Sequence, residues 1–201
     1  MSITTYINRV IDLLYDKFYG IDTCEIDRLD DNRTINYEYV PSWYLSLRYI
    51  FTKYGFNPND VLVDFGCGKG RVLIMAANHG CANAIGVVVN KRMYNQAIVN
   101  IDKYLERKSG LANISIINED AKKFVVKSEY NKFFLYNPFH LKVLIYVLKN
   151  ISNSLATCPR KIMLFLFDPQ EFVIKCIENT KEYIMIEHIL KQKIVVFVSN
   201  G

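Results

Sequence analysis

Short apolar runs alternate with longer segments of helical period along the chain after residue 60. The apolar runs are rich in Val, Ile and Phe, as strands buried on both faces are. Between them, apolar residues recur at the spacing of helices that cover a sheet. We expect strands at 61–65, 84–89, 114–118, 133–136 and 161–167, and helices at 70–79, 91–108, 140–155 and 170–180.

Two further apolar runs, 183–189 and 194–199, end the chain. The connection between them, Leu190 to Lys193, is too short for a crossover helix, so a hairpin is the connection that remains. The sequence therefore predicts a doubly wound α/β fold, in which a mostly parallel seven-stranded sheet ends in an antiparallel hairpin.

The first 60 residues follow a different pattern. A helical period runs from Ile3 to Phe18, a polar stretch at 22–36 is rich in Asp and Arg, and a second helix is expected at 43–54. We expect the polar stretch to be a loop or lid. Because no repeat or linker separates the regions, we expect one domain, 1–201, with a helical cap at 1–55 and a Rossmann-like core at 56–201.

Composition narrows the class of protein. A chain of 201 residues with 51% hydrophobic residues can bury one sizeable core. No apolar run approaches the roughly 20 residues of a membrane span, so we expect a cytoplasmic protein without a membrane partner. The five cysteines are scattered, which favours neither disulfides nor a metal site. The net charge of +5 is spread along the chain and predicts no nucleic-acid surface.

The strand at 61–65 leads directly into a loop with glycines at positions 66, 68 and 70. Glycines let the backbone turn sharply and approach a ligand closely, and N–H groups at the start of the next helix suit a polar or anionic ligand. Such a loop also occurs as a tight turn without a ligand. The spacing differs from the G-x-G-x-x-G of dinucleotide-binding domains.

With Asp64 before it, this loop resembles motif I of class I S-adenosylmethionine-dependent methyltransferases. Together with Tyr39 to Ser42, the run from Asp60 to Leu73 resembles bacterial methyltransferases that carry a Y-x-P-[TS] segment and a D-x-G-[SC]-G-K-G-R loop. Those are similar to the non-SET lysine methyltransferases. The resemblance covers roughly residues 35–140 and implies the Rossmann-like methyltransferase fold, of which a terminal hairpin is expected. It also implies S-adenosylmethionine as cofactor, bound by Asp64, Gly66, Cys67, Gly68 and Gly70.

The resemblance implies further cofactor contacts outside the loop. Ser42 would offer a hydroxyl to the methionine end, and Tyr39 would help to close the pocket. Alternatively, Ser42 caps the helix at 43–54. Asp120 would accept a hydrogen bond from the adenine amino group, and the N–H of Ala121 would meet the ring. Asp120 equally suits the cap of a helix that begins at Ala121, and the two roles are compatible.

Val88 departs from the family pattern. It stands where the family has an acidic residue that holds both ribose hydroxyls, and a valine side chain accepts no hydrogen bond. Three interpretations remain open. Asn90 supplies a weaker polar contact, or the nucleoside is held differently, or cofactor affinity has been lost and the fold serves another purpose.

Asn137-Pro138-Phe139 follows the strand at 133–136, at the edge where open α/β sheets bind ligands. It resembles the [DN]-P-P-[YF] motif of methyltransferases that modify amino nitrogens, shortened by one proline. The resemblance implies that Asn137 orients the target nitrogen toward the cofactor and that the ring of Phe139 packs on the target. The alternative is an ordinary Asn-Pro turn at a strand end.

These features lead to three hypotheses of function. The first is an enzyme that transfers a methyl group from S-adenosylmethionine to an amino nitrogen of a protein or small molecule, without a metal. The second is a catalytically inactive methyltransferase-like binding or scaffold protein, as Val88 suggests. The third, a nicotinamide-dependent oxidoreductase, is disfavoured by the glycine spacing and the terminal hairpin.

Overall fold

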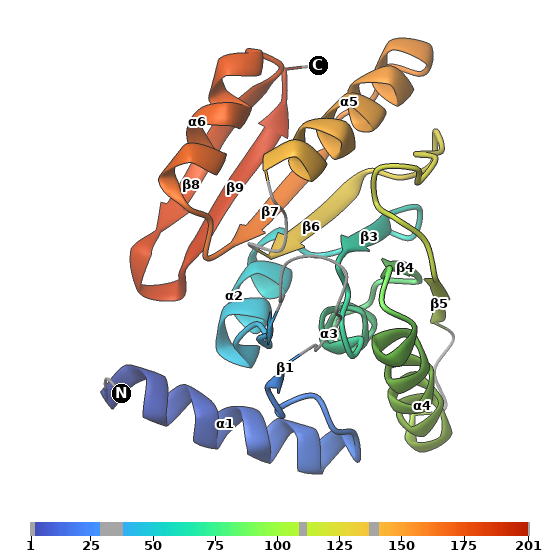
Figure 1. The fold of residues 1–201 in the computed structure, drawn as a ribbon, viewed down its shortest axis with the longest axis vertical. Coiled ribbons are helices and arrows are strands. Elements are labelled where there is room, and N and C mark those ends of the chain that lie inside the picture. The colour runs from blue at the N-terminus through green and yellow to red at the C-terminus, as the bar shows by residue number, and fades with distance from the viewer. Residues whose placement is uncertain (1–2, 29–37, 109–111, 137–140, 201) are drawn as a thin grey trace.

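A seven-stranded sheet forms the centre of the protein (Figure 1). The structure is a computed structural model that describes residues 3–28, 38–108, 112–136 and 141–200. The strand order is β5-β4-β3-β6-β7-β9-β8, and the first five of these strands are parallel. The strands are β3 (Val61–Phe65), β4 (Asn83–Val87), β5 (Asn113–Ile117), β6 (Lys132–Tyr136), β7 (Met163–Phe167), β8 (Tyr183–Ile189) and β9 (Ile194–Ser199).

The end of the chain forms the predicted hairpin. Strand β9 is antiparallel to both β7 and β8, and the 3-10 helix η1 (Leu190–Gln192) connects β8 to β9. The mostly parallel sheet with an antiparallel hairpin is therefore confirmed.

Helices cover both faces of this sheet. The helices are α2 (Tyr44–Tyr54), α3 (Arg71–Asn78) and α4 (Lys91–Arg107) on one face, and α5 (Leu141–Thr157) and α6 (Glu171–Thr180) on the other. Side chains alternate along each strand, so that in β3 Leu62 joins the first layer and Val63 the second. The central strands β3, β6 and β7 are buried on both faces, which explains why their sequences are mainly apolar.

Most predicted elements are present with bounds that differ by one or two residues. The strand expected at 84–89 ends at Val87, so Val88 and Val89 lie beyond it. The side chain of Asn118 explains this early end, because its Nδ2 atom donates to the carbonyl oxygens of Val88 (2.8 Å) and Val89 (3.0 Å). A side chain thus takes the carbonyls that a longer strand would offer to a neighbour.

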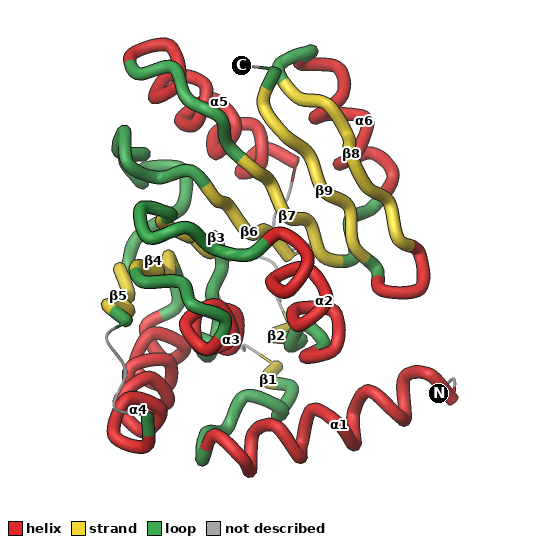
Figure 2. The backbone as a smooth tube through the Cα atoms, turned by 180° about the vertical axis from the view of Figure 1, so that it is seen from behind, coloured by secondary structure: helices red, strands yellow, loops and turns green. Residues whose placement is uncertain are grey.

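The first part of the N-terminal region, with α1, lies outside the first helical layer (Figure 2). Helix α1 (Ile3–Tyr19) contacts α2 and α4, and β1 (Asp27–Arg28) pairs with β2 (Glu38–Tyr39). This two-stranded sheet was not predicted, because the polar stretch in which it begins has no alternating pattern. Among the helices of the described residues, none combines the length and the apolar character that crossing a membrane requires.

Candidate active site

The glycine loop joins β3 to α3 at the carboxyl edge of the sheet. Gly66, Gly68 and Gly70 all have positive φ angles, 84°, 50° and 87° respectively, which side-chain-bearing residues rarely adopt. The N–H groups of Gly66 and Cys67 donate to the carbonyl oxygen of Val87 at 2.8 and 3.2 Å, and the Gly70 N–H donates to Cys67 at 2.8 Å. The shape of the loop is therefore fixed by its own hydrogen bonds and by the end of β4.

Gly86 in β4 lets the loop pack closely on the sheet. A Cβ atom at Gly86 would lie 2.6 Å from the Sγ atom of Cys67 and 2.8 Å from Cδ1 of Leu73. Cys67 thus points into the core, and burial raises the pKa of its thiol well above the usual value. A protonated, buried thiol is a packing group in this loop and not a nucleophile.

Asp64 carries a carboxyl group behind the loop. Its side chain is 2% exposed, and its Oδ2 atom is buried without a hydrogen-bond partner among the described residues. Burial raises the pKa of Asp64 to about 8, because the charged form is poorly solvated there. Buried polar atoms without partners are uncommon, so Oδ2 of Asp64 has an unused capacity to form a hydrogen bond.

The ring of Tyr39 covers the loop at Gly68. A Cβ atom at Gly68 would lie 2.3 Å from Cε2 of this ring, and the Tyr39 hydroxyl donates to the carbonyl of Thr23 at 3.0 Å. The Nζ atom of Lys69 lies 5.3 Å from the ring centroid and donates to the carbonyl of Glu25 at 3.1 Å. Tyr39 therefore covers one side of the loop, and its part in closing a cofactor pocket stays a prediction.

Arg71, the first residue of α3, ties the N-terminal region to this loop. Its guanidinium is 2% exposed at the side chain and donates to Asp12 Oδ2 (2.8 Å), to the Ser42 carbonyl (2.7 Å) and to Thr23 Oγ1 (2.7 Å). It also stacks on Tyr44, with Cζ 4.2 Å from the ring centroid. One buried cation thus holds three separate segments of the first 55 residues.

Two carboxylates of α1 complete this cluster. Asp12 accepts the N–H of Tyr44 at 3.0 Å, and Asp16 accepts the Tyr44 hydroxyl at 2.7 Å. Burial raises the pKa of Asp12, although Arg71 acts in the opposite direction. Neither Arg71 nor the two aspartates was predicted from the sequence to form this cluster. The four-residue spacing of Asp12 and Asp16, which places both on one face of a helix, is the pattern that could have indicated it.

Ser42 does not cap α2. The N-cap is Trp43, which makes no side-chain capping bond, and the N–H of Tyr44 is already taken by Asp12. The predicted capping role was therefore wrong. Ser42 is buried with its carbonyl on Arg71, and its contact with a cofactor stays a prediction.

The polar residues near the ends of β4 and β5 also have roles within the protein. The Oδ1 atom of Asn90 caps α4 by accepting the N–H of Met93 at 3.0 Å, and Val88 is buried. Asp120 accepts the Lys122 N–H at 3.0 Å in a turn, and no helix begins at Ala121. The capping alternative for Asp120 was therefore wrong, because the chain continues as a turn and then extended towards β6.

The segment Asn137-Pro138-Phe139 lies outside the described residues, which end at Tyr136 on this side. The ring of Tyr136 packs edge-on against Phe167, 4.8 Å between centroids, and Phe167 in turn contacts Trp43 at 6.0 Å. Asp168, just beyond β7, pairs with Lys193 at 2.7 Å. Aromatic and charged side chains therefore lie close to the described end of β6.

The sheet order, the terminal hairpin and the glycine loop after β3 define a class I, Rossmann-like methyltransferase fold. Solved structures agree. The chain resembles a human methyltransferase 10 domain containing protein over 96% of both chains, with a TM-score of 0.63 and 14% identity. It also resembles an RNA methyltransferase from Salinibacter ruber in complex with S-adenosyl-L-homocysteine, with a TM-score of 0.58 and 17% identity, over 80% of this chain and 92% of that one.

Sequence comparison points to the same class. A family model described as "Putative methyltransferase" matches residues 58–138, from the turn before β3 to the segment after β6. A curated relative, a protein-lysine N-methyltransferase from Saccharolobus islandicus, is 33% identical over 66 residues. That match covers 32% of this chain and 41% of the relative, so it spans less than half of either protein.

Proposed function

We propose that this chain is an S-adenosylmethionine-dependent methyltransferase that acts on an amino nitrogen. The observation that carries the proposal is the buried Asp64 carboxyl, which lacks a partner for Oδ2 directly behind a preformed glycine loop. A structural loop without a ligand would not need a carboxyl group there, because burying it without a partner costs stability.

The residues around the loop suit S-adenosylmethionine. Its methionine end carries an ammonium group, and a carboxylate at Asp64 would accept a hydrogen bond from it and be stabilised by its charge. Tyr39 covers the loop at Gly68, and Ser42 is held nearby through Arg71. When bound, the cofactor supplies a methyl group activated by a positively charged sulfur.

The amino-nitrogen acceptor is supported by Asn137-Pro138-Phe139 and by the character of its neighbours. We infer that the Asn137 carbonyl orients the nitrogen lone pair and that the Phe139 ring packs on the acceptor. As the nitrogen bonds to the methyl carbon, the carbon–sulfur bond breaks, and the methylated amine then releases a proton to solvent. Positioning of the two reactants would supply most of the rate enhancement. The relative from Saccharolobus islandicus, a protein-lysine N-methyltransferase, favours a lysine side chain.

Calorimetry with S-adenosylhomocysteine tests the cofactor, and transfer of a labelled methyl group to amine acceptors tests the reaction. We expect micromolar to submillimolar binding. The variant Asn137→Ala should lose turnover while it keeps cofactor affinity. Absence of binding at millimolar S-adenosylhomocysteine would contradict the proposal that the chain is a methyltransferase.

Val88 supports one competing function, a binding or scaffold protein that has lost the cofactor. The variant Val88→Glu separates the two, because a carboxylate there would reach the ribose hydroxyls. Val88 is buried, so Val88→Gln, which has the same shape without the charge, controls for packing damage. A wild type that binds no cofactor, together with a Val88→Glu variant that does, would favour the scaffold.

We also infer that residues 1–201 act as one domain with 1–55 as its cap. Contacts of α2 with the terminal hairpin support this. The Ser46 hydroxyl donates to the carbonyl of Gln192 at 2.9 Å, and the Tyr49 hydroxyl donates to Glu187 at 2.9 Å. The cap is thus bonded to the last strands as well as to the glycine loop.

A further inference from the structure

Helix α1 buries its polar side and exposes its apolar side. Its buried residues are polar or carry a hydroxyl: Asn8, Asp12, Asp16 and Tyr19. Its exposed residues include a long apolar set, whose side chains are between 41% (Val10) and 80% (Ile3) accessible: Ile3, Tyr6, Ile7, Val10, Leu13, Leu14 and Phe18. A surface helix ordinarily turns its apolar stripe toward the core, and this one turns it outward.

The reversal has a cause on the inner side. Asp12 and Asp16 face inward because they bind Arg71, Tyr44 and the loop after α1. The outer apolar residues therefore contribute little to holding α1 in place. An exposed apolar stripe along a whole helix is unusual and marks an interaction surface.

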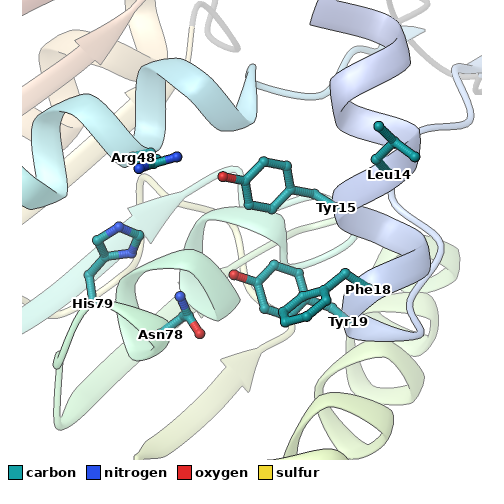
Figure 3. Close-up of a pocket in the computed structure, with 7 residues that line it drawn as sticks. All are labelled: Leu14, Tyr15, Phe18, Tyr19, Arg48, Asn78 and His79. Carbon is teal, nitrogen blue, oxygen red and sulfur yellow. The ribbon is translucent and has the colours of Figure 1, made fainter.

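A groove deepens this surface on one side. It has a volume of about 450 Å³ and lies between α1 and the helices α2 and α3 (Figure 3). One wall is mainly aromatic and comes from α1, and the other is polar and comes from α2 and the end of α3. The aromatic wall consists of Leu14, Tyr15, Phe18 and Tyr19, with the hydroxyls of Tyr15 and Tyr19 directed across the groove, and the polar wall consists of Arg48, Asn78 and His79 (Figure 3).

The charges on this surface are basic. On α1 both acidic residues are buried, while Arg9 and Lys17 are exposed. Arg48 lines the groove, and the Nζ atom of Lys108 lies 5.6 Å from the centroid of the Phe18 ring. The charged side chains that these observations place on the exposed side of α1 or at its groove, Arg9, Lys17, Arg48 and Lys108, are thus cations.

We propose that the outer face of α1 docks on an anionic lipid bilayer. A helix with an apolar stripe, aromatic residues and flanking cations lies in the plane of a membrane surface, with its apolar side a few ångströms below the headgroups. The phosphates of anionic lipids would pair with Arg9, Lys17 and Arg48, and the net charge of +5 adds long-range attraction.

Charge and shape favour a bilayer over other occupants. If two copies met through α1, their cations would face one another in the contact, which is destabilising. Helix α1 lies at the outer edge of the molecule (Figure 1), so it presents a ridge that fits a deformable surface. The proposal departs from the expectation of no membrane partner, which rested on the absence of a spanning apolar run, because an interfacial helix binds the bilayer without crossing it. The proposal also does not depend on methyl transfer.

Co-sedimentation of the full-length chain with vesicles tests this docking. We expect binding to phosphatidylcholine vesicles that contain about 30% phosphatidylglycerol, and weak binding to phosphatidylcholine alone or at high salt. Arg9→Gln with Lys17→Gln should lower the partition coefficient roughly thirtyfold, since each cation near such a surface contributes about a factor of five.

A matched pair of double variants isolates the apolar face. Leu14→Gln with Phe18→Gln should lower partitioning at least about tenfold. Val125→Gln with Leu190→Gln, at two highly exposed apolar side chains that are not part of α1 and do not line its groove, should leave it unchanged. Circular dichroism and thermal melts will show that all four sites tolerate the change.

Four outcomes would overturn the proposal. The first is absence of binding to anionic vesicles, and the second is equal binding to neutral and anionic ones. The third is a dimer, detected by light scattering without vesicle binding, that Leu14→Gln with Phe18→Gln dissociates. That result would assign the face to a second copy of the chain. Capture of an acidic protein in the same assay, again without vesicle binding, would assign it to a protein partner.

Discussion

Asp64 couples the stability of the protein to pH. Burial raises the pKa of Asp64 to about 8, whereas in the unfolded chain a carboxyl of this type titrates near pH 4. Between these values the folded state holds a proton that the unfolded state has lost. The stabilisation by protonated Asp64 is therefore fully present below about pH 4 and is lost as the pH rises through about 8.

We predict that Asp64→Asn removes this pH dependence. The free energy of unfolding of the wild type should fall relative to that of the variant by up to about 1.4 kcal/mol per pH unit across this window. Urea denaturation of both proteins at several pH values measures the difference. A difference that stays constant with pH would contradict the raised pKa.

Ligand binding should reverse the preference of Asp64 for its protonated form. An ammonium group beside the carboxyl favours its ionised form, so binding of S-adenosylhomocysteine below pH 8 should release a proton from the wild type. Calorimetry near pH 7 in two buffers with different ionisation enthalpies measures this release. Asp64→Asn should bind without it. Proton uptake by the wild type would place the ammonium group elsewhere.

Gly68 carries both backbone and steric constraints. We predict that Gly68→Ala displaces the Tyr39 ring and weakens cofactor binding, because the new Cβ would lie 2.3 Å from that ring. Gly80→Ala is the matched control, since Gly80 also has a positive φ (90°) but no atom within 4 Å of a new Cβ. Both should lose about 1 kcal/mol of stability from backbone strain. Only Gly68→Ala should lower affinity for S-adenosylhomocysteine.

At the scale of elements, the cluster around Arg71 determines how the N-terminal helices attach. We predict that Arg71→Met destabilises the protein by about 3–5 kcal/mol, because it leaves Asp12 and Asp16 buried without their cation. Arg48→Met, at an exposed arginine on the neighbouring helix, should change stability by less than about 0.5 kcal/mol. Urea denaturation compares the two. Equal effects would show that α1 is held by apolar contacts instead.

Periodicity in the sequence was sufficient to predict the elements of the core. Strands β3, β6 and β7 are mainly apolar, and the short connection between 183–189 and 194–199 permits only a hairpin. The orientation of α1 was not predictable from its pattern, because its polar side is buried. An apolar stripe normally identifies the inner face, and a single buried cation in a distant helix reversed that rule here.

The candidate site was predictable in part for a similar reason. The glycine loop and Asp64 are contiguous in the sequence, so their spacing and its resemblance to motif I were enough to make them candidates. Asn118, Arg71 and Tyr44 act through contacts between segments that lie far apart in the chain, and no local pattern reports such contacts. Strand β4 ends at Val87, before Val88, because the side chain of Asn118 binds the carbonyl oxygens that follow. The run of valines did not indicate this early end.

For the whole molecule, cofactor binding should appear as added thermal stability. At a ligand concentration about a hundred times the dissociation constant, the free energy of unfolding rises by about 2.7 kcal/mol. For a chain of this length we predict an increase in Tm of about 5–10 °C with S-adenosylhomocysteine. NADH at the same concentration should produce none. An increase with NADH alone would favour the oxidoreductase that the glycine spacing disfavours.

The position of Arg71 also links two remote surfaces by reciprocity. The guanidinium of Arg71 is bound by the carboxylates of α1. The backbone of the same residue begins α3, the helix that follows the glycine loop. Any factor by which occupation of the loop strengthens the attachment of α1 must equal the factor by which attached α1 strengthens affinity at the loop. Through this coupling, the attachment of α1 at the edge of the fold would change the affinity of the glycine loop for its ligand.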